Sequence, residues 1–151
     1  MASIEEEIKQ QKKFESEYQK AVVNILYTSG WLYNQNAYRL KKHDITPEQY
    51  NVLRILRGSH PQAIMLGEIT SRMIDKNSNA TRLVEKLRLK GLVKREICPN
   101  NRRQVDINIT NKGLSLLSAI DADSDEWNNS LKSITKSEAQ ELNRILDKLR
   151  S

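Results

Sequence analysis

Apolar side chains recur at helical spacing along most of this chain. Between about Phe14 and Lys42 they fall at steps of three and four residues with no proline, which predicts one long helix. A helix of about 28 residues is roughly 42 Å long at 1.5 Å per residue, which exceeds the width of a small domain. Part of its apolar face must then be covered by something beyond the chain's own core, and a second copy of the chain is the expected cover. Residues 1–13 are mostly charged and polar and predict a frayed start.

Two short helices joined by a turn are expected in the middle of the chain. After a helix that starts at a capping box at Thr46, the pattern predicts a short helix over residues 66–73 and another that ends at Gly91. The N-terminal cap of the helix that ends at Gly91 is expected to be Asn77 or Ser78. Its apolar positions share one face and its polar, cationic positions share the other, which is typical of the second helix of a helix-turn-helix unit.

A β-hairpin is expected to follow this unit. Leu92–Ile97 reads as a short strand, and residues 105–109 alternate strictly between apolar and polar, as a half-buried strand does. The segment between them holds a proline, two asparagines and two adjacent arginines, which is typical of a turn. Thr110 is then expected to cap a helix that continues past an acidic stretch to Leu131.

The last helix is expected to follow a capping box formed by Thr135 and Glu138. It is predicted to bury one apolar face, made of Ala139, Leu142, Ile145, Leu146 and Leu149. The order of these elements predicts a mainly α fold with a small β-hairpin wing. This is the pattern of a winged helix-turn-helix with long N- and C-terminal helices.

The net charge of +6 is concentrated in one part of the chain. Residues 72–112 carry 11 Lys and Arg against 4 Asp and Glu, a net of +7, so the remainder is close to neutral at −1. A basic patch on a neutral body is the electrostatic pattern of nucleic-acid binding, although a charge run can also be a solvated face.

Composition and motifs exclude several classes of protein. One cysteine rules out an internal disulfide, and no apolar run approaches the ~18 residues that a membrane helix needs, so we expect no membrane association. The acidic, polar N-terminus is unlike a signal peptide, and we expect a cytoplasmic protein. No nucleophile–base pair, metal-ligand spacing or phosphate-binding glycine loop is present. We therefore expect no enzymatic activity, no catalytic residues, no metal and no cofactor.

Four motifs stand in a fixed order, at Ile45–Tyr50, Ser78–Val93, Asn101–Arg103 and Ile109–Gly113. Together they resemble the MarR family of winged-helix transcriptional regulators over about residues 45–113. The resemblance implies an N-terminal dimerisation helix over residues 1–44, a winged helix-turn-helix DNA-binding lobe over 45–110 and C-terminal dimerisation helices over 111–151. It implies a homodimer on a pseudo-palindromic double-stranded DNA site, and a repressor that releases DNA when a small-molecule effector binds. One departure is Asn101, because wings of the family usually carry an aspartate there.

The expected DNA contacts lie on the recognition helix and the wing. Asn79 and Arg82 have side chains that can bond adenine and guanine edges, and Lys86 is expected at a phosphate. Arg102 is expected in the minor groove, where a narrow groove attracts a guanidinium. The full set of predicted contacts is Ser78, Asn79, Thr81, Arg82, Lys86, Arg102 and Arg103.

Two further features carry open alternatives. The aromatic residues Tyr27, Trp31, Tyr38 and Tyr50 either pack in the core and dimer interface or line an effector pocket. Cys98 is either structural or a redox sensor whose basic neighbours favour the thiolate. The alternative function for the whole chain is a winged-helix protein-interaction module without specific DNA binding.

Overall fold

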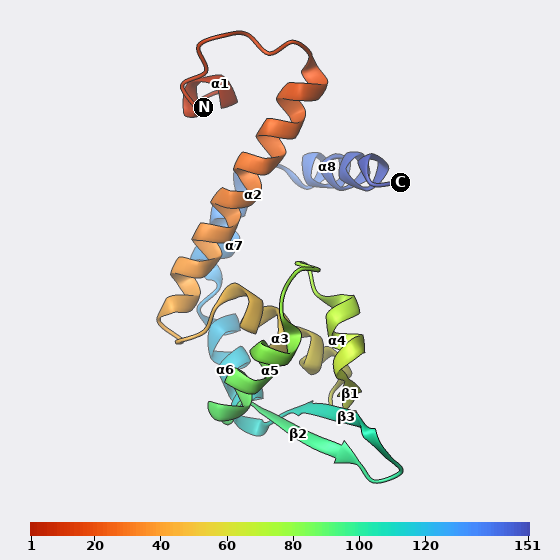
Figure 1. The fold of residues 1–151 in the computed structure, drawn as a ribbon. Helices are drawn as coiled ribbons and strands as arrows, with labels where there is room; N and C mark the ends of the chain where they lie inside the picture. Colours follow the sequence, from red (N-terminus) through yellow and green to blue (C-terminus); the bar gives the residue numbers. More distant parts are fainter. The chain divides into compact units, whose positions relative to one another are not determined.

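The computed structural model describes all 151 residues (Figure 1). The chain divides into two compact units, residues 1–50 and residues 51–151, which we describe in turn. In chain order the elements are α1 (Ile4–Glu7), α2 (Glu17–Lys41), α3 (Pro47–Ser59), β1 (Ile64–Met65), α4 (Leu66–Arg72), α5 (Ala80–Leu89), β2 (Val93–Cys98), β3 (Asn101–Ile109), α6 (Asn111–Ala122), α7 (Asp125–Ser130), a 3-10 turn η1 (Leu131–Ser133) and α8 (Lys136–Leu149). A mainly helical winged fold is therefore confirmed.

The first unit is built on α2, the long helix that the apolar spacing predicted. The frayed start predicted for residues 1–13 is wrong, because α1 forms there with a capping box between Ser3 and Glu6. Two side-chain contacts tie α1 to α2: Glu5 pairs with Lys20 at 2.6 Å, and the Tyr27 hydroxyl donates to the Glu7 carboxylate at 2.9 Å. The charged residues that suggested fraying thus hold the segment against the helix.

The apolar face of α2 is largely uncovered within the single chain. Exposed apolar and aromatic side chains along the helix include Tyr18, Val22, Ile25, Leu26, Tyr27, Trp31, Tyr33 and Tyr38. The expectation that this chain's own core would not cover the long helix agrees with these exposures. None of the helices combines the length and the apolar composition that a membrane-spanning helix requires.

Helix α3 begins at the end of the first unit and runs into the second. The predicted capping box is present, since the Thr46 hydroxyl accepts from the Gln49 amide at 3.2 Å and the Gln49 side chain accepts from the Thr46 amide at 3.0 Å. The helix ends one residue beyond Gly58, at Ser59. Val52, Leu53, Ile55 and Leu56 are buried, which makes α3 the central helix of the lobe.

The second unit contains a three-stranded antiparallel sheet in the order β1-β3-β2. The hairpin pairs Val93 with Ile109 and Ile97 with Val105, and its ladder is irregular after Ile97. The two-residue strand β1, which pairs Ile64 with Ile107, was not predicted from the sequence. Two residues are too few to show the period-two alternation that marks a strand.

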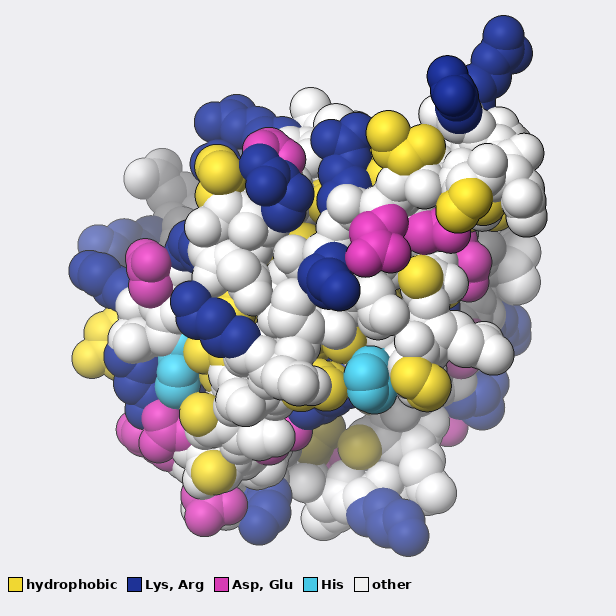
Figure 2. All heavy atoms as spheres, turned by 90° about the horizontal axis from the view of Figure 1, so that it is seen from below, with side chains coloured by type: hydrophobic (Ala, Val, Ile, Leu, Met, Phe, Trp, Pro, Cys, Tyr) yellow, Lys and Arg dark blue, Asp and Glu magenta, His cyan; other side chains and the backbone are white.

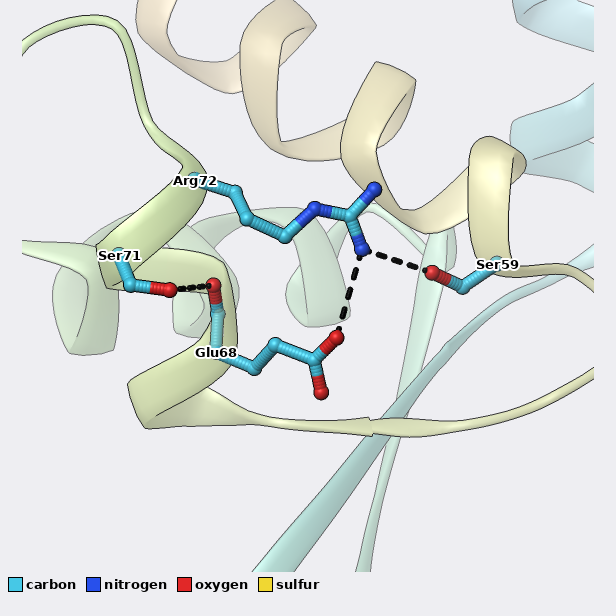
Figure 3. Close-up of polar contacts among 4 residues, drawn as sticks. All are labelled: Ser59, Glu68, Ser71 and Arg72. Carbon is cyan, nitrogen blue, oxygen red and sulfur yellow. Dashed lines mark hydrogen bonds and ion pairs between the residues drawn. The ribbon is translucent and has the colours of Figure 1, made fainter.

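The core of this unit joins α3, α4, α5, α6 and the sheet. Its fully buried side chains include Leu53, Leu56, Ile69, Met73, Leu87, Ile107, Leu117 and Ile120. A polar contact ties α4 to the end of α3 at the surface: the Arg72 guanidinium donates to the Ser59 hydroxyl at 3.0 Å and lies 3.5 Å from the Glu68 carboxylate (Figure 3). This contact joins the two helices at the surface, next to the apolar core.

The C-terminal segment departs from the prediction in two respects. Helix α6 stops at Ala122 instead of continuing to Leu131, and a separate short helix, α7, begins at Asp125. The Ser124 hydroxyl donates to the Asp121 carbonyl at 2.6 Å, which closes the last turn of α6. The capping box at Thr135 and Glu138 is present. On the apolar face of α8, Leu142, Ile145 and Leu149 are exposed and Ala139 and Leu146 are half-buried, so the predicted burial of this face is wrong for the single chain.

Candidate nucleic-acid interface

Helix α5 is the predicted recognition helix, and its N-terminus is capped by Asn79. The Asn79 side-chain oxygen accepts a hydrogen bond from the Arg82 amide at 3.0 Å, so a cap at Asn77 or Ser78 is wrong. An asparagine cap satisfies one of the free amides in the first turn. The same oxygen would be needed to bond the amino group of adenine, so Asn79 has a structural task beside any contact to a base.

The outer face of α5 carries exposed cations. Ala80, Val84 and Leu87 are buried on the inner face, whereas Arg82 and Lys86 point to solvent and their side chains bond no other group of the chain. Thr81 is exposed beside them. Arg82 forms no ion pair with an acidic side chain of the chain. These side chains are therefore available to an anionic partner.

Ser78 lies differently from the rest of the predicted set. It is half-buried, and its hydroxyl oxygen is fully buried with no hydrogen-bond partner in the chain. A phosphate contact through this hydroxyl would require a local rearrangement. The sequence offered no signal of this burial, because serine before a helix ordinarily reads as an exposed cap.

The C-terminus of α5 is clamped by the start of α6. Gly91 adopts φ +73°, the left-handed stop that was predicted there. The Thr110 hydroxyl donates to the Gly91 carbonyl at 2.7 Å, and the Lys112 ammonium donates to the Lys90 carbonyl at 2.8 Å. A Cβ on Gly113 would lie 2.4 Å from the Leu92 carbonyl oxygen, so only glycine allows this approach. The clamp fixes the recognition helix relative to the base of the wing.

The two arginines predicted in the turn of the hairpin lie instead at the start of β3, next to the wing tip. Arg102 and Arg103 are exposed, and neither side chain bonds another group of the chain. The Asn101 side-chain oxygen accepts from the Arg103 backbone amide at 3.1 Å. Where wings of the family usually carry an aspartate, Asn101 thus forms a neutral hydrogen bond with the backbone. Cys98 at the base of the tip is half-buried and forms no disulfide.

Acidic side chains interrupt the basic surface, and no role for them was predicted from the sequence. In the view of Figure 2, Lys and Arg side chains are spread over the face of the molecule with Asp and Glu between them. On α5 the acid is Glu85, which accepts two hydrogen bonds from Arg88, at 2.9 Å from Nε and 2.7 Å from the second guanidinium nitrogen. These bonds hold the pKa of Glu85 below its usual range, and the nearby charges of Arg88 and Arg95 lower it further.

The four aromatic residues of the predicted effector site all lie in the first unit. Tyr27 is engaged with Glu7, and the Arg39 guanidinium lies 5.2 Å from the centre of the Tyr50 ring. Trp31 and Tyr38 are exposed. A hollow of about 470 Å³ lies elsewhere, among α7, η1 and α8, where apolar side chains such as Leu131, Ile134 and Leu142 line it. No cluster of three His, Cys, Asp or Glu side chains could hold a metal ion.

Comparison with known proteins identifies the class of this fold. The model of the MarR family matches residues 45–105. The HTH-type transcriptional repressor IacR of Pseudomonas putida is 32% identical over 117 residues, which cover 76% of this chain and 69% of that protein. The chain therefore belongs to the MarR family, a family of transcriptional regulators.

Solved structures agree with the winged fold. A putative MarR-like transcription regulator from Bacillus cereus superimposes with a TM-score of 0.78 at 23% identity and covers 89% of this chain and 96% of its own. MepR of S. aureus, solved in complex with DNA, superimposes with a TM-score of 0.75 at 22% identity over 91% of this chain and 97% of its own. At these identities the likeness establishes the fold.

Proposed function

We propose that this protein is a sequence-specific DNA-binding repressor that binds a pseudo-palindromic site as a homodimer. The observation that carries the proposal is the pairing of exposed cations, on α5 and on the wing tip, with a clamp that fixes the two elements relative to each other. Membership of the MarR family supports the regulatory role. A DNA-binding role also fits the cytoplasmic location expected from the sequence.

In the proposed complex α5 enters the major groove and the wing tip reaches the adjacent minor groove. Arg82 contacts a base edge or a phosphate, Lys86 contacts a phosphate, and Thr81 lies against the sugar–phosphate backbone. Arg102 enters the minor groove. The side-chain oxygen of Asn79 caps α5, so Asn79 contacts a base only through its side-chain NH2 group.

The homodimer is supported by the exposed apolar faces of α2 and α8. Leu142, Ile145 and Leu149 lie on one side of α8 and are exposed in the single chain. A contiguous apolar face of this kind marks an interaction site in a protein that remains in solution. A second copy would cover it and would hold two recognition helices about one DNA turn apart, roughly 34 Å.

Regulation by a small molecule is part of the proposal. The relative in Pseudomonas putida is named a repressor, which supports repression as the outcome. Tyr27, Trp31, Tyr38 and Tyr50 remain the proposed effector contacts. An effector that binds one spacing of the two recognition helices better than another would shift the population between them, and with it the affinity for DNA.

Selection of duplexes from a random pool tests the proposal directly. We expect recovery of a palindrome whose half-site centres lie about one turn apart. On that duplex Arg102→Ala should weaken binding about tenfold or more, because a lost contact costs ~1–3 kcal/mol. Fluorescence anisotropy measures this, and an unchanged dissociation constant would contradict the assigned role of Arg102.

Salt dependence separates this function from a protein-interaction module with a structural basic hairpin. DNA binding should weaken steeply with salt, because each neutralised phosphate contributes about 0.9 to the slope of log K against log salt. If the protein bound no duplex even at low salt, the DNA-binding proposal would fail and the interaction module would be favoured.

A further inference from the structure

Glu85 is the only acidic side chain on the recognition helix. It lies one turn after Thr81 and one turn before Arg88, on a stripe that flanks the outward-facing Arg82 and Lys86. Its side chain is 42% exposed, so it is in contact with solvent and with anything that docks on this face. An anion at this place opposes phosphate binding unless it is paired.

Arg88 is the partner of Glu85, and two hydrogen bonds between them orient the Arg88 guanidinium. Nε and the second terminal nitrogen each donate to one carboxylate oxygen of Glu85, at 2.9 and 2.7 Å. This two-point contact favours one orientation of the guanidinium plane. Three of the five N–H groups remain available, including both on the other terminal nitrogen.

Glu85 lies within electrostatic range of the hairpin. Helix α5 packs against β2 (Figure 1), and Arg95 of β2 is close enough to Glu85 to lower the pKa of its carboxyl group. If α5 occupies a major groove and the wing the neighbouring minor groove, one sugar–phosphate strand must pass between them. The free edge of Arg88 is then near phosphates of that strand.

We propose that Arg88 is a phosphate contact and that Glu85 is its positioning residue, which makes the pair a determinant of specificity. A guanidinium held in one orientation can contact a phosphate only when the DNA is docked at one position along the helix α5. A mobile guanidinium could contact a phosphate at any docking position on any DNA sequence, because phosphate contacts carry no sequence information. Glu85 therefore weakens binding to non-specific DNA, and it preserves the contact between Arg88 and a phosphate in the sequence-specific complex. This inference rests on the proposed DNA-binding function.

The chain offers a matched control for the test. On α8, Glu141 and Arg144 have the same spacing and the same two-point contact, at 2.8 and 2.6 Å. Glu141→Gln changes the net charge as Glu85→Gln does, but away from the recognition helix. Arg88→Gln and the double variant Glu85→Gln/Arg88→Gln complete a cycle that shows whether Glu85 acts through Arg88.

The experiment measures the dissociation constants of all variants for the selected duplex and for a scrambled duplex over a range of salt. We expect Glu85→Gln to tighten binding to the scrambled duplex about three- to tenfold, with a salt slope steeper by about one, as for one added phosphate contact. The selected duplex should tighten less than the scrambled duplex, so the ratio of the two dissociation constants, which measures discrimination, should fall. Arg88→Gln should weaken the selected complex about tenfold. Glu141→Gln should leave both constants within about twofold, because salt screens charges beyond about 10 Å.

The outcomes are distinguishable. Glu85→Gln acting like Glu141→Gln, or keeping its effect on discrimination in the Arg88→Gln background, would overturn this inference and leave the DNA-binding function standing. Binding of no duplex by the wild-type protein would overturn both. Thermal unfolding of each variant confirms that the fold is intact.

Discussion

The winged lobe and the C-terminal helix α8 use similar amphipathic patterns with opposite results. In the lobe, the apolar face of α5 is covered, and Leu87 is fully buried together with Ile69 of α4 and Ile107 of β3. In α8, Leu142 is 48% exposed and Leu149 is 62% exposed. The spacing of apolar residues identifies which face avoids water, but the cover comes from the rest of the chain in one case and, under our proposal, from a second chain in the other.

This difference separates folding from assembly. Burial of apolar side chains contributes ~25 cal/mol per Å² of apolar surface removed from water. The lobe obtains this contribution within one chain, whereas α8 would obtain it only when another surface covers it. We therefore expect changes in the lobe to alter stability at any protein concentration, and changes in α8 to act through the concentration-dependent dimer.

The largest effect is expected at Gly113, where the lobe has no spare room. Gly113→Ala would place a Cβ 2.4 Å from a backbone oxygen and 2.6 Å from the Ile109 side chain. We expect a loss of at least ~3 kcal/mol, at or above the upper end of the usual cost of overpacking. Urea unfolding measures the loss. Gly67→Ala is the control, since a Cβ there meets nothing within 4 Å, and equal stability of the two variants would show that the close approach is not a constraint.

The next effect tests the exposed face of α8. Leu142→Asp should raise the dissociation constant of the homodimer at least about thirtyfold, or ~2 kcal/mol, because it would bury an unpaired charge. Sedimentation velocity over a concentration series measures this. Gln140→Asp adds the same charge at another exposed position on α8 and should leave the dimer unchanged. A Leu142→Asp protein that assembles like wild type would show that α8 is not covered by a second copy.

A smaller pair of effects compares the helix caps of the two regions. Asn79→Ala and Thr135→Ala each remove a side chain that caps the first turn of its helix, at a cost of ~1 kcal/mol. We expect the first to lower the free energy of unfolding of the lobe and the second to weaken the dimer. Urea unfolding and sedimentation distinguish them. The serine variants at both positions keep a cap and should remain near wild type, and a loss in either serine variant would point to another role.

The smallest effect is a pH dependence at the start of α8. The Thr135 amide and hydroxyl both donate to the Glu138 carboxylate, which lowers the pKa of Glu138. A lowered pKa stabilises the folded cap above the ordinary glutamate pKa, and this stabilisation is lost as pH falls through the folded value. NMR should show the Thr135 amide shift changing below about pH 4. Glu138→Gln should abolish the change, and a midpoint above the ordinary glutamate range would contradict the cap.

The sequence predicted those parts of the fold that local chemistry determines. The caps at Thr46, Thr110 and Thr135 and the stop at Gly91 were all identified from residue type and position. The break after Ala122 was not, because the acidic residues beyond it are compatible with a continuous helix. The spacing of apolar residues could not predict whether the apolar face of α8 is covered. This spacing describes a single helix, whereas burial depends on the neighbouring elements.

In the candidate site, too, some features could be predicted from the sequence and others could not. Exposed cations at Arg82, Lys86 and Arg102 were expected, and they are present on the surface. The Glu85–Arg88 pair was missed, although an acid three residues before an arginine is the one signal that could have suggested it. The buried hydroxyl of Ser78 gave no signal, because its burial arises from tertiary packing.

Under the proposed DNA-binding function, Asn79 has a consequence for how the specificity of this protein can evolve. Because its side chain caps α5, a substitution that altered base preference there would also alter stability unless it retained a capping group. The suitable replacements are few, chiefly aspartate, serine and threonine. Arg82 and Lys86 carry no such task and can vary while the fold persists. New operator preferences are therefore more accessible through the middle of the recognition helix than through its first turn.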